Sequence, residues 1–401
     1  MNQTSGPEPV RLDGELFSDP HGLYRRMGRG GPPRPVVLPN EWPGWLVTSY
    51  GDARRLLGDA RVSKDITQAF DLFPPGRARA YASALSANML AADPPDHTRL
   101  RRLVNKAFTS RTVERLRPRI GQIADDLLAA IEPGSQVDLL DAYALPLPII
   151  VICDLLGVPA ADRANFRAWT LTFVSLTSQE EFDEADRCLT AYLTALIDDK
   201  RANPADDLLS ELVQVSDQGS TLSPGETLSM AFLLLLAGFE TTVNLIANGM
   251  LALLQHPDQL ALLRSDPSLI PGAIEEILRL DGPVHVATVR FTTEPVPVGE
   301  TEIPAKQLVF ISLLAANRDG DRFTDPDTLD VTRPAAGHLA FGHGIHHCVG
   351  NAVAKLEVRV AVQVLLERLG DWEVDMSAVE RSQLVPTRGV AHAPTTFAPI
   401  S

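Results

Sequence analysis

One short stretch, residues 341–350, carries residue types that could hold a reactive metal centre. It consists of Phe-Gly-His-Gly-Ile-His-His-Cys-Val-Gly, and its glycines allow a tight loop that side chains would forbid. A helix with an apolar stripe is predicted to begin at Asn351, so Cys348 lies at or just before a helix N-terminus. The amide N–H groups and the helix dipole at such a position favour a thiolate. A thiolate held in a glycine-rich turn is what an axial ligand of haem iron requires.

Two other interpretations of this loop stay open. A lone cysteine in an apolar protein is usually inert core filling. His346, His347 and Cys348 could also bind zinc, which accepts imidazole and thiolate ligands. Adjacent residues do not converge easily on one tetrahedral centre, however, and the chain has no Cys-x-x-Cys pair to complete a zinc site. Zinc is therefore the weaker hypothesis.

The spacing within residues 341–350 resembles the cysteine-ligand loop of the cytochrome P450 family of haem-thiolate monooxygenases. That loop has the pattern Phe-Gly-x-Gly-x-His-x-Cys-x-Gly, and every fixed position is filled here. The resemblance implies that Cys348 is the metal ligand of haem b (iron protoporphyrin IX). The haem would be held non-covalently, because there is no Cys-x-x-Cys-His motif. Further haem contacts implied by the resemblance come from Phe341, Gly342, His346 and Gly350.

Three basic residues elsewhere could bind the carboxylates of such a cofactor. His97 and Arg101 are four residues apart on a predicted helix, so they share one face, and both side chains are natural anion donors. A solvated basic face is the simpler interpretation, but Asp-Pro-Pro-x-His-x-x-x-Arg resembles the family's propionate-binding segment. Arg290 follows apolar residues on a predicted strand and needs an anionic partner if it points inward. By resemblance, that partner is also a haem propionate.

The longest apolar helix, predicted over residues 223–254, contains polar residues that lower helix propensity in its middle. Such a conflict is expected at functional sites. Ala237 and Gly238 would let a ligand approach the backbone closely, Thr241 could hydrogen-bond a helix carbonyl, and Glu240 could relay protons. A simple kink, with the acid reaching solvent, is the alternative. The segment resembles the family's oxygen-binding groove, which implies that Glu240 and Thr241 deliver protons to reduced oxygen.

Glu276 and Arg279 are three residues apart on a predicted helix, a spacing that is normally a surface pair worth a few tenths of a kcal/mol. The pair matches the family's Glu-x-x-Arg element, and Arg333 fits its third member. The resemblance implies a buried ion network with a structural role near the cysteine loop.

Candidate substrate contacts are assigned only by their position in the resembled family, and each of them could equally be plain core. They are Phe239, Val286, Ala287, Pro386 and Thr387.

The whole chain must position these groups. Its 401 residues are 45% hydrophobic and 22% charged, and its net charge of 36 − 51 = −15 argues against nucleic acid as the main partner. Its three cysteines do not suggest a disulfide framework, so a cytoplasmic location is expected. The N-terminus is neither a signal peptide nor an anchor, and the apolar run 230–239 is too short to span a membrane.

The resemblance implies one domain over residues 1–401, with residues 1–20 a loosely ordered arm. The fold would be mainly α with small β-sheets, a triangular prism with haem between the groove helix and the cysteine-loop helix. Strands are expected within residues 284–311 and again from Trp372 onward. The likeness is nearest to soluble actinobacterial members that tailor polyketides and macrolides.

The function implied is insertion of one oxygen atom from O2 into a small hydrophobic substrate by hydroxylation or epoxidation. The chain has no dinucleotide fingerprint and no iron–sulfur cysteine set, so electrons would come from a ferredoxin and an NAD(P)H-dependent ferredoxin reductase. Arg102, Lys106 and Lys355 are hypothesised to present a basic face to that carrier. A peroxygenase that uses hydrogen peroxide, a non-enzymatic haem sensor and, more distantly, a zinc hydrolase are the alternatives.

Overall fold

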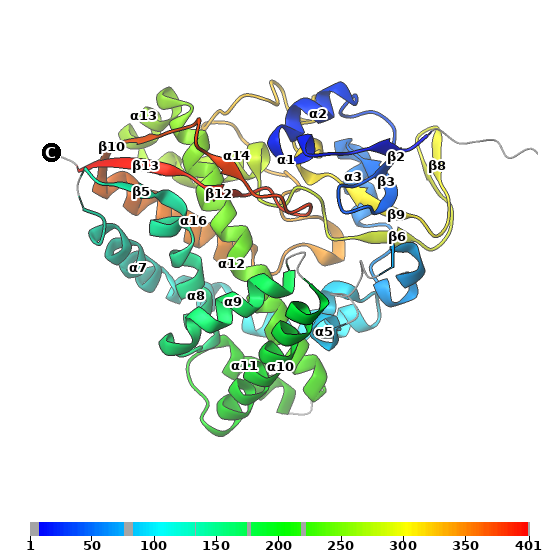
Figure 1. Cartoon of the computed structure of the whole chain (residues 1–401), viewed down its shortest axis with the longest axis horizontal. Helices are drawn as coiled ribbons and strands as arrows, with labels where there is room; N and C mark the ends of the chain where they lie inside the picture. Colours follow the sequence, from blue (N-terminus) through cyan, green and yellow to red (C-terminus); the bar gives the residue numbers. More distant parts are fainter. Residues whose placement is uncertain (1–7, 76–82, 133, 175–177, 218–221, 400–401) are drawn as a thin grey trace, which may run out of the picture. The chain divides into compact units, whose positions relative to one another are not determined.

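The computed structural model describes residues 8–75, 83–132, 134–174, 178–217 and 222–399. The contacts between residues divide the chain into two compact units. The first unit consists of Met1–Ala78, Asn248–Cys348 and Val379–Ala391, and the second of Arg79–Ala247, Val349–Ala378 and His392–Ser401. Helices with small sheets make up the described chain (Figure 1), which confirms the predicted fold class.

A mixed six-stranded sheet forms the framework of the first unit, with the strand order β1-β2-β3-β9-β6-β4. The pairs β1–β2 and β3–β9 are parallel, whereas the other neighbours are antiparallel. β9 is buried at every position, as a strand with neighbours on both sides usually is. The strands are β1 (Val10–Arg11), β2 (Arg34–Val37), β3 (Pro43–Val47), β4 (Val62–Ser63), β6 (Arg290–Thr292) and β9 (Leu308–Ile311).

The remaining elements of the first unit are short helices, 3-10 turns and two-stranded sheets. Its helices are α1 (Glu15–Ser18), α2 (Pro20–Arg26), α3 (Tyr50–Leu57), α13 (Pro257–Ser265), α14 (Ile270–Asp281) and α15 (Leu313–Ala316). Its 3-10 turns are η1 (Ile66–Gln68), η2 (Phe70–Leu72), η7 (Pro267–Leu269) and η8 (Gly344–His346). The two-stranded sheets pair β7 (Val296–Val298) with β8 (Thr301–Ile303) and β11 (Glu380–Arg381) with β12 (Val390–His392).

The described N-terminal residues contact other parts of the first unit. Residues 1–7 lie outside the described part of the chain. From residue 8 onward, however, β1 pairs with β2 in register Val10 to Val36, and Leu16 of α1 is only 1% exposed. These contacts order residues 10–20, because an edge strand pairs its backbone and a buried leucine anchors the next helix.

Helices dominate the second unit. The longest helix described is α12 (Pro224–Leu254), which belongs to the second unit as far as Ala247 and to the first unit from Asn248 onward. Its start is stabilised by a reciprocal cap. The backbone N–H of Ser223 donates to Glu226 Oε2 at 2.7 Å, and the N–H of Glu226 donates to Ser223 Oγ at 3.2 Å. The other helices are α5 (Asp96–Ala107), α6 (Ser110–Arg115), α7 (Arg117–Ala129), α8 (Pro146–Leu156), α9 (Arg163–Val174), α10 (Gln179–Ala202), α11 (Leu208–Asp217) and α16 (Asn351–Arg368).

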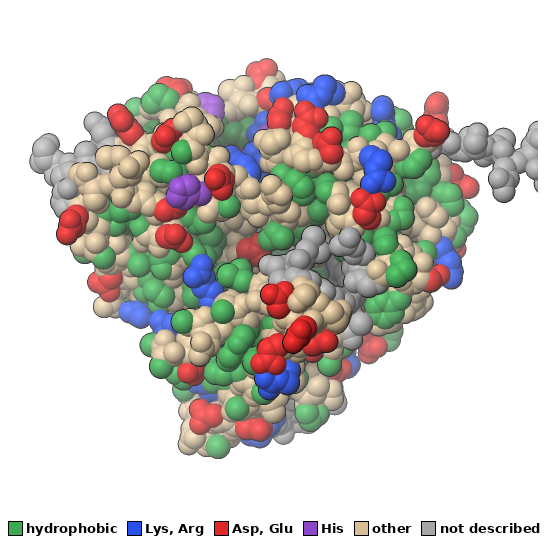
Figure 2. Space-filling model, in the orientation of Figure 1, with side chains coloured by type: hydrophobic (Ala, Val, Ile, Leu, Met, Phe, Trp, Pro, Cys, Tyr) green, Lys and Arg blue, Asp and Glu red, His purple; other side chains and the backbone are tan. Residues whose placement is uncertain are grey.

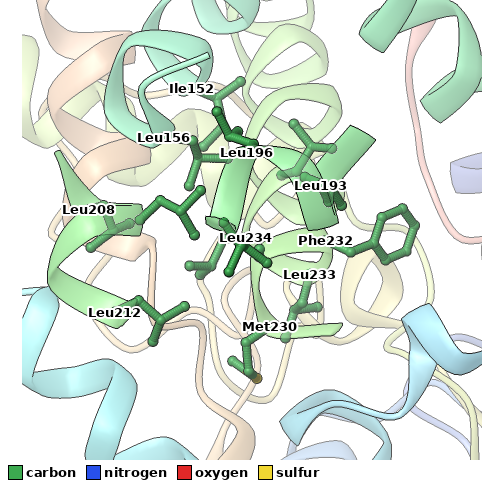
Figure 3. Close-up of a cluster of buried hydrophobic side chains, with 14 of the residues drawn as sticks. Ile152, Leu156, Leu193, Leu196, Leu208, Leu212, Met230, Phe232, Leu233 and Leu234 are labelled. Atoms are coloured by element: carbon green, nitrogen blue, oxygen red, sulfur yellow. The ribbon is translucent and has the colours of Figure 1, made fainter. Parts of the chain in front are cut away.

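The core of the second unit is a cluster of leucine, isoleucine, methionine and phenylalanine side chains. Figure 3 shows Leu193 and Leu196 of α10 beside Leu234 of α12, with Ile152 of α8 in the same cluster. Each such fully buried side chain contributes about 1.5–3 kcal/mol relative to exposure. α12 is therefore held by apolar packing on several sides, which explains why it is apolar nearly all round.

Short segments and one small sheet complete the second unit. The turns are η3 (Ala84–Ser86), η4 (Met89–Ala91), η5 (Leu140–Ala144, a π-helical turn) and η6 (Ala160–Asp162). The sheet has the order β10-β13-β5, with β5 (Gln136–Asp138), β10 (Leu369–Val374) and β13 (Pro394–Pro399). Tyr143 binds this region to α16, because its hydroxyl donates to the carbonyl oxygen of Ala361 at 2.8 Å.

Candidate functional site

The cysteine loop closes on itself through backbone hydrogen bonds. The N–H of Cys348 donates to the carbonyl oxygen of Phe341 at 3.0 Å, and that of Gly342 donates to Leu339 at 2.7 Å. Gly342 and Gly344 have φ of +73° and +74°, a conformation that side chains rarely adopt. A Cβ at Gly344 would also lie 3.0 Å from the carbonyl oxygen of Leu57. Glycine is therefore required at these turns.

Cys348 differs from the other two cysteines in its surroundings. It is half-buried and lies three residues before the first residue of α16. Cys153 is inside α8, where burial raises the pKa of its thiol to about 11, and Cys188 is inside α10. Only Cys348 lies next to a helix N-terminus, where N–H groups and the helix dipole stabilise a thiolate.

Three side chains anchor the segment that enters this loop. Asn317 accepts a hydrogen bond from the N–H of Leu339 at 2.6 Å, and the Tyr50 hydroxyl donates to the carbonyl oxygen of Gly337 at 2.7 Å. His338 lies 3.0 Å from a carboxylate oxygen of Glu275. The loop is thus fixed to α3, α14 and α15 before it turns, which preorganises the cysteine.

Phe341 lies between two imidazole rings. Its ring centroid is 6.1 Å from that of His338 and 6.4 Å from that of His347. His347 is exposed, whereas Phe341 is half-buried. The imidazole of His347 therefore lies beside the loop rather than within it.

Glu276, Arg279 and Arg333 form an ion network in the first unit, of the kind that the family resemblance implies. Glu276 and Arg279 are both 0% exposed, and two guanidinium nitrogens of Arg279 donate to the carboxylate at 2.7 and 2.8 Å. Arg333 Nε donates to the same carboxylate at 3.0 Å. Arg279 also donates to the carbonyl oxygens of Asn317, Pro326 and Thr328. These bonds tie α14 to the segment that leads into the cysteine loop.

Arg290 is deeply buried, with 4% of its surface exposed, on strand β6 of the first unit. Lys64, which follows β4, is 2% exposed and bonds the Thr288 hydroxyl, two residues before Arg290. The burial of Lys64 could not be predicted, because a lysine after a short strand carries no local signal of burial. Lys64 and Arg290 are thus two buried cations in one region of the first unit. His346 is half-buried in η8.

His97 and Arg101 occupy α5 in the second unit, as the spacing predicts. His97 is 2% exposed, whereas Arg101 is half-buried and its Nε donates to Asn105 Oδ1 at 3.1 Å. Between them, Arg99 pairs with Glu226 at the start of α12. That ion pair ties α5 to the helix that carries Glu240 and Thr241.

The middle of α12 combines a buried helix with accessible polar groups. Ala237 is exposed, and Gly238, Glu240 and Thr241 are half-buried, between runs of buried residues on both sides. The Thr241 hydroxyl donates to the carbonyl oxygen of Ala237 at 2.9 Å. The predicted threonine-to-carbonyl bond is thus present, and it lies where a bound molecule can reach the helix.

Gly238 has a packing reason that the sequence did not indicate. A Cβ at this position would lie 2.8 Å from the Cδ1 atom of Ile152 in α8. Real Cβ atoms do not approach so closely, so glycine allows α8 and α12 to pack together. What approaches the backbone of Gly238 in the described chain is therefore a helix of the same unit.

The candidate substrate contacts fall into two groups. Phe239 and Val286 are each 4% exposed, and Phe239 belongs to the core cluster of the second unit. Ala287 is half-buried and packs against the core of the first unit. Pro386 is exposed and Thr387 half-buried. Phe239 and Ala287 thus contribute to their cores whatever else they contact.

The residues present fit a haem group. Its iron takes a thiolate ligand, and its two propionates need cationic or N–H donors. In the first unit, the half-buried Cys348 could supply the thiolate, and the buried Arg290 is a cationic donor. In the second unit, taken by itself, the buried His97 carries a ring N–H that could donate to a carboxylate.

The zinc alternative finds no support. In the part of the chain that the structure describes, no group of three or more His, Cys, Asp or Glu side chains could hold a metal ion.

Among the described helices, α12 is long and apolar enough to cross a membrane, but 72% of its apolar window is buried inside the protein. Such burial is typical of a core helix.

Comparisons with known proteins agree with this geometry. The family model described as "Cytochrome P450" matches residues 152–396. The cytochrome P450 monooxygenase PikC of Streptomyces venezuelae is 50% identical, over 92% of this chain and 88% of its own. The vitamin D(3) 25-hydroxylase of Pseudonocardia autotrophica is 45% identical, over 99% of both chains. Two more distant relatives, each 41% identical, are named 6-deoxyerythronolide B hydroxylase and mycinamicin IV hydroxylase/epoxidase.

A solved P450 structure is also similar to this chain in fold and sequence. The tirandamycin C-bound P450 monooxygenase TamI has a TM-score of 0.89 and is 44% identical, covering 96% of this chain and 99% of its own.

Proposed function

The chain belongs to the cytochrome P450 family, and on that premise we propose that it tailors a macrocyclic polyketide by hydroxylation or epoxidation. The monooxygenase activity follows from the relatives, which are named as monooxygenases and hydroxylases. The observation that carries the assignment is the position of Cys348, in a loop closed by its own N–H and next to the start of α16.

Cys348 would ligate the iron of haem b. His97, Arg101, Arg290 and His346 would hold the propionates, and Phe341, Gly342, Gly350, Ala237 and Gly238 would contact the macrocycle. When bound, the haem supplies the oxygen activation and the oxidation of the substrate. As a thiolate, the Cys348 sulfur would donate electron density to the group that it ligates.

Thr241 and Glu240 are assigned to proton handling. The Thr241 hydroxyl already donates to a helix carbonyl, and both side chains are half-buried in the accessible middle of α12. A carboxyl and a hydroxyl group one residue apart can hold and pass protons at their oxygens. An enzyme that uses O2 and two electrons needs protons from the protein, and such a pair could supply them. Hydrogen peroxide already carries two protons, so a peroxygenase would need the pair less.

A structural role is assigned to the ion network of Glu276, Arg279 and Arg333. Glu276 and Arg279 are 0% exposed, and the bonds of the three side chains fix the segment that leads into the cysteine loop. Val286, Ala287, Phe239, Pro386 and Thr387 remain proposed substrate contacts.

The substrate class rests on the relatives. The relatives named 6-deoxyerythronolide B hydroxylase and mycinamicin IV hydroxylase/epoxidase favour a macrocyclic polyketide. The vitamin D(3) hydroxylase, at 45% identity, makes a secosteroid the second candidate. Titration of the ferric protein with a macrolactone and with a secosteroid should give a spin-state shift of the Soret band with the macrolactone at the lower concentration. The reverse order would overturn the polyketide assignment.

The electron source is proposed to be a ferredoxin with its NAD(P)H-dependent reductase, in the cytoplasm. The ferrous protein with carbon monoxide should show the long-wavelength Soret band of thiolate ligation, and Cys348→Ala should lose it. Turnover should require ferredoxin, reductase and NADPH. Equal turnover with hydrogen peroxide alone would instead identify a peroxygenase, and haem binding with no turnover from either source would favour a sensor.

A further inference from the structure

Two segments that we propose to contact substrate, residues 284–287 and 384–387, are paired along their backbones within the first unit. They are joined by an antiparallel bridge between Val284 and Thr387, and by hydrogen bonds from the N–H of His285 to Pro386 (3.0 Å) and from the N–H of Arg388 to Pro283 (2.8 Å). The two segments therefore move together if either is displaced.

One buried asparagine holds the ends of both segments. Asn248 is 1% exposed, and its Nδ2 donates to the carbonyl oxygen of Asp281 at 3.2 Å and to that of Arg388 at 2.9 Å. Asp281 ends α14 just before the first segment, and Arg388 directly follows the second. The Oδ1 of Asn248 accepts from Arg381 at 2.9 Å, so the amide has a partner on both of its polar atoms.

A buried ion pair joins the same two ends. Arg388 Nε donates to Asp281 Oδ1, and the two side chains are 10% and 12% exposed. The Asp281 carboxylate also lies 3.2 Å from His21 Nε2, and Arg388 donates to the carbonyl oxygen of Phe17 at 3.4 Å. Removing one partner of such a pair leaves a buried charge and destabilises the fold strongly. Asn248 is therefore the better residue to change, because its side chain carries no charge of its own.

We propose that Asn248 is a positioning residue for substrate, because it sets how segments 284–287 and 384–387 lie against each other. Asn248 belongs to α12, the helix that carries Thr241. Within the first unit, one amide thus holds both segments together. Bulky ligands, which must fit against both segments, depend on it more than small ones. The inference rests on the proposed function, which assigns the two segments to substrate contact.

The test uses two nitrogen ligands of haem iron that differ in size, imidazole and 4-phenylimidazole. Both are followed by the Soret shift of the ferric holoenzyme. Asn248→Ala should raise the Kd of 4-phenylimidazole about three- to tenfold, the range expected when hydrogen bonds of ordinary strength are lost. The Kd of imidazole should change by less than about twofold, because the smaller ligand does not reach the displaced wall.

Asn248→Asp is the second variant if Asn248→Ala fails to fold. It keeps an acceptor for Arg381 and removes both N–H donors. It should raise the Kd of 4-phenylimidazole in the same way.

Arg318→Gln is the matched control. Arg318 is 8% exposed and donates to the carbonyl oxygen of Leu280 at 2.8 Å, one residue before Asp281. It supports the same end of α14, and its hydrogen bonds and ion pair in the described chain go to Leu280 and Asp327 rather than to residues 384–388. It should lower the Tm and leave the ratio of the two Kd values unchanged.

Different results would overturn the positioning role of Asn248 and the proposed haem function. If the Asn248 variants and Arg318→Gln share the parent's Kd ratio, Asn248 is merely structural and the inference is wrong. If the parent protein shows no Soret shift with imidazole, the proposed haem function is wrong instead.

Discussion

Thr241 and Thr242 are neighbours on α12 with the same local hydrogen bond but different surroundings. The Thr241 hydroxyl donates to Ala237 at 2.9 Å, and that of Thr242 donates to Gly238 at 3.1 Å. Thr242 is 2% exposed, whereas Thr241 is half-buried. A bound molecule can therefore reach only the first hydroxyl, and only that one can pass a proton to it.

Thr241→Ala is expected to separate oxygen consumption from product formation. Product per NADPH should fall about tenfold or more, because positioned proton donors contribute at least that much, while NADPH oxidation continues. Product and hydrogen peroxide should be measured together in the reconstituted system.

Thr242→Ala is the control, since it removes the same type of bond from the buried neighbour. It should form as much product per NADPH as the parent protein does. Thr241→Ser, which keeps a hydroxyl group, should restore most of the product per NADPH. Equal uncoupling in both alanine variants would argue against a proton role for Thr241.

At the scale of elements, α2 and α14 meet through buried histidines. His21 of α2 contacts Asp281, the last residue of α14, and His285 accepts or donates a 2.6 Å hydrogen bond with the Tyr24 hydroxyl. Burial lowers the pKa of His21 to about 4 and that of His285 to about 3. Both imidazoles are therefore neutral in the folded chain at pH 7.

These depressed pKa values predict acid sensitivity. In the unfolded chain the imidazoles take up protons below a pKa of about 6.5, so the free energy of unfolding is at its full value above that pH and falls as the pH is lowered toward about 4. The loss between pH 6.5 and 5 should be roughly 2 kcal/mol for each histidine. Urea unfolding of the holoenzyme, followed by tryptophan fluorescence, measures it.

His285→Gln removes one of these titrating groups and keeps an acceptor for Tyr24. Its unfolding free energy should therefore depend less on pH between 6.5 and 5 than that of the parent protein. A variant with the parent's pH dependence would show that His285 is not neutralised by burial.

At the scale of the whole molecule, the net charge is −15, and Figure 2 shows acidic and basic side chains interspersed on the face drawn. Arg102 and Lys106 are exposed and four residues apart on α5, so they share a helix face. Lys355 is half-buried on α16 of the same unit. A local basic area can steer an acidic carrier even when the net charge is negative.

Reversing the charges of Arg102 and Lys106 to glutamate should therefore slow reduction by ferredoxin. We expect the KM for ferredoxin to rise about tenfold at low salt, with a smaller effect at high salt, where surface charges are screened. Arg167→Glu, at an exposed arginine of α9, is the matched control. Unchanged reduction in the double variant would contradict docking at this face.

The amino-acid sequence alone determined the features that depend on short spacings. The glycines of residues 341–350, the pair Glu276–Arg279 and the bond from Thr241 to Ala237 all involve residues within one loop or one helical turn. Turn and helix geometry is local, so spacing is enough to predict which groups meet. The mainly helical fold class was implied by the resemblance of residues 341–350 and the other motifs to the cytochrome P450 family.

Only the tertiary structure decided the contacts between distant parts of the chain. The approach of Ile152 to Gly238, the burial of Lys64 and the binding of Asn248 to Asp281 and Arg388 join residues far apart in sequence. No local pattern encodes such contacts, because they depend on which helix faces and strand ends the packing within each unit brings together. Phe239 shows the same limit, since its place in the motif could not show that it packs in the core.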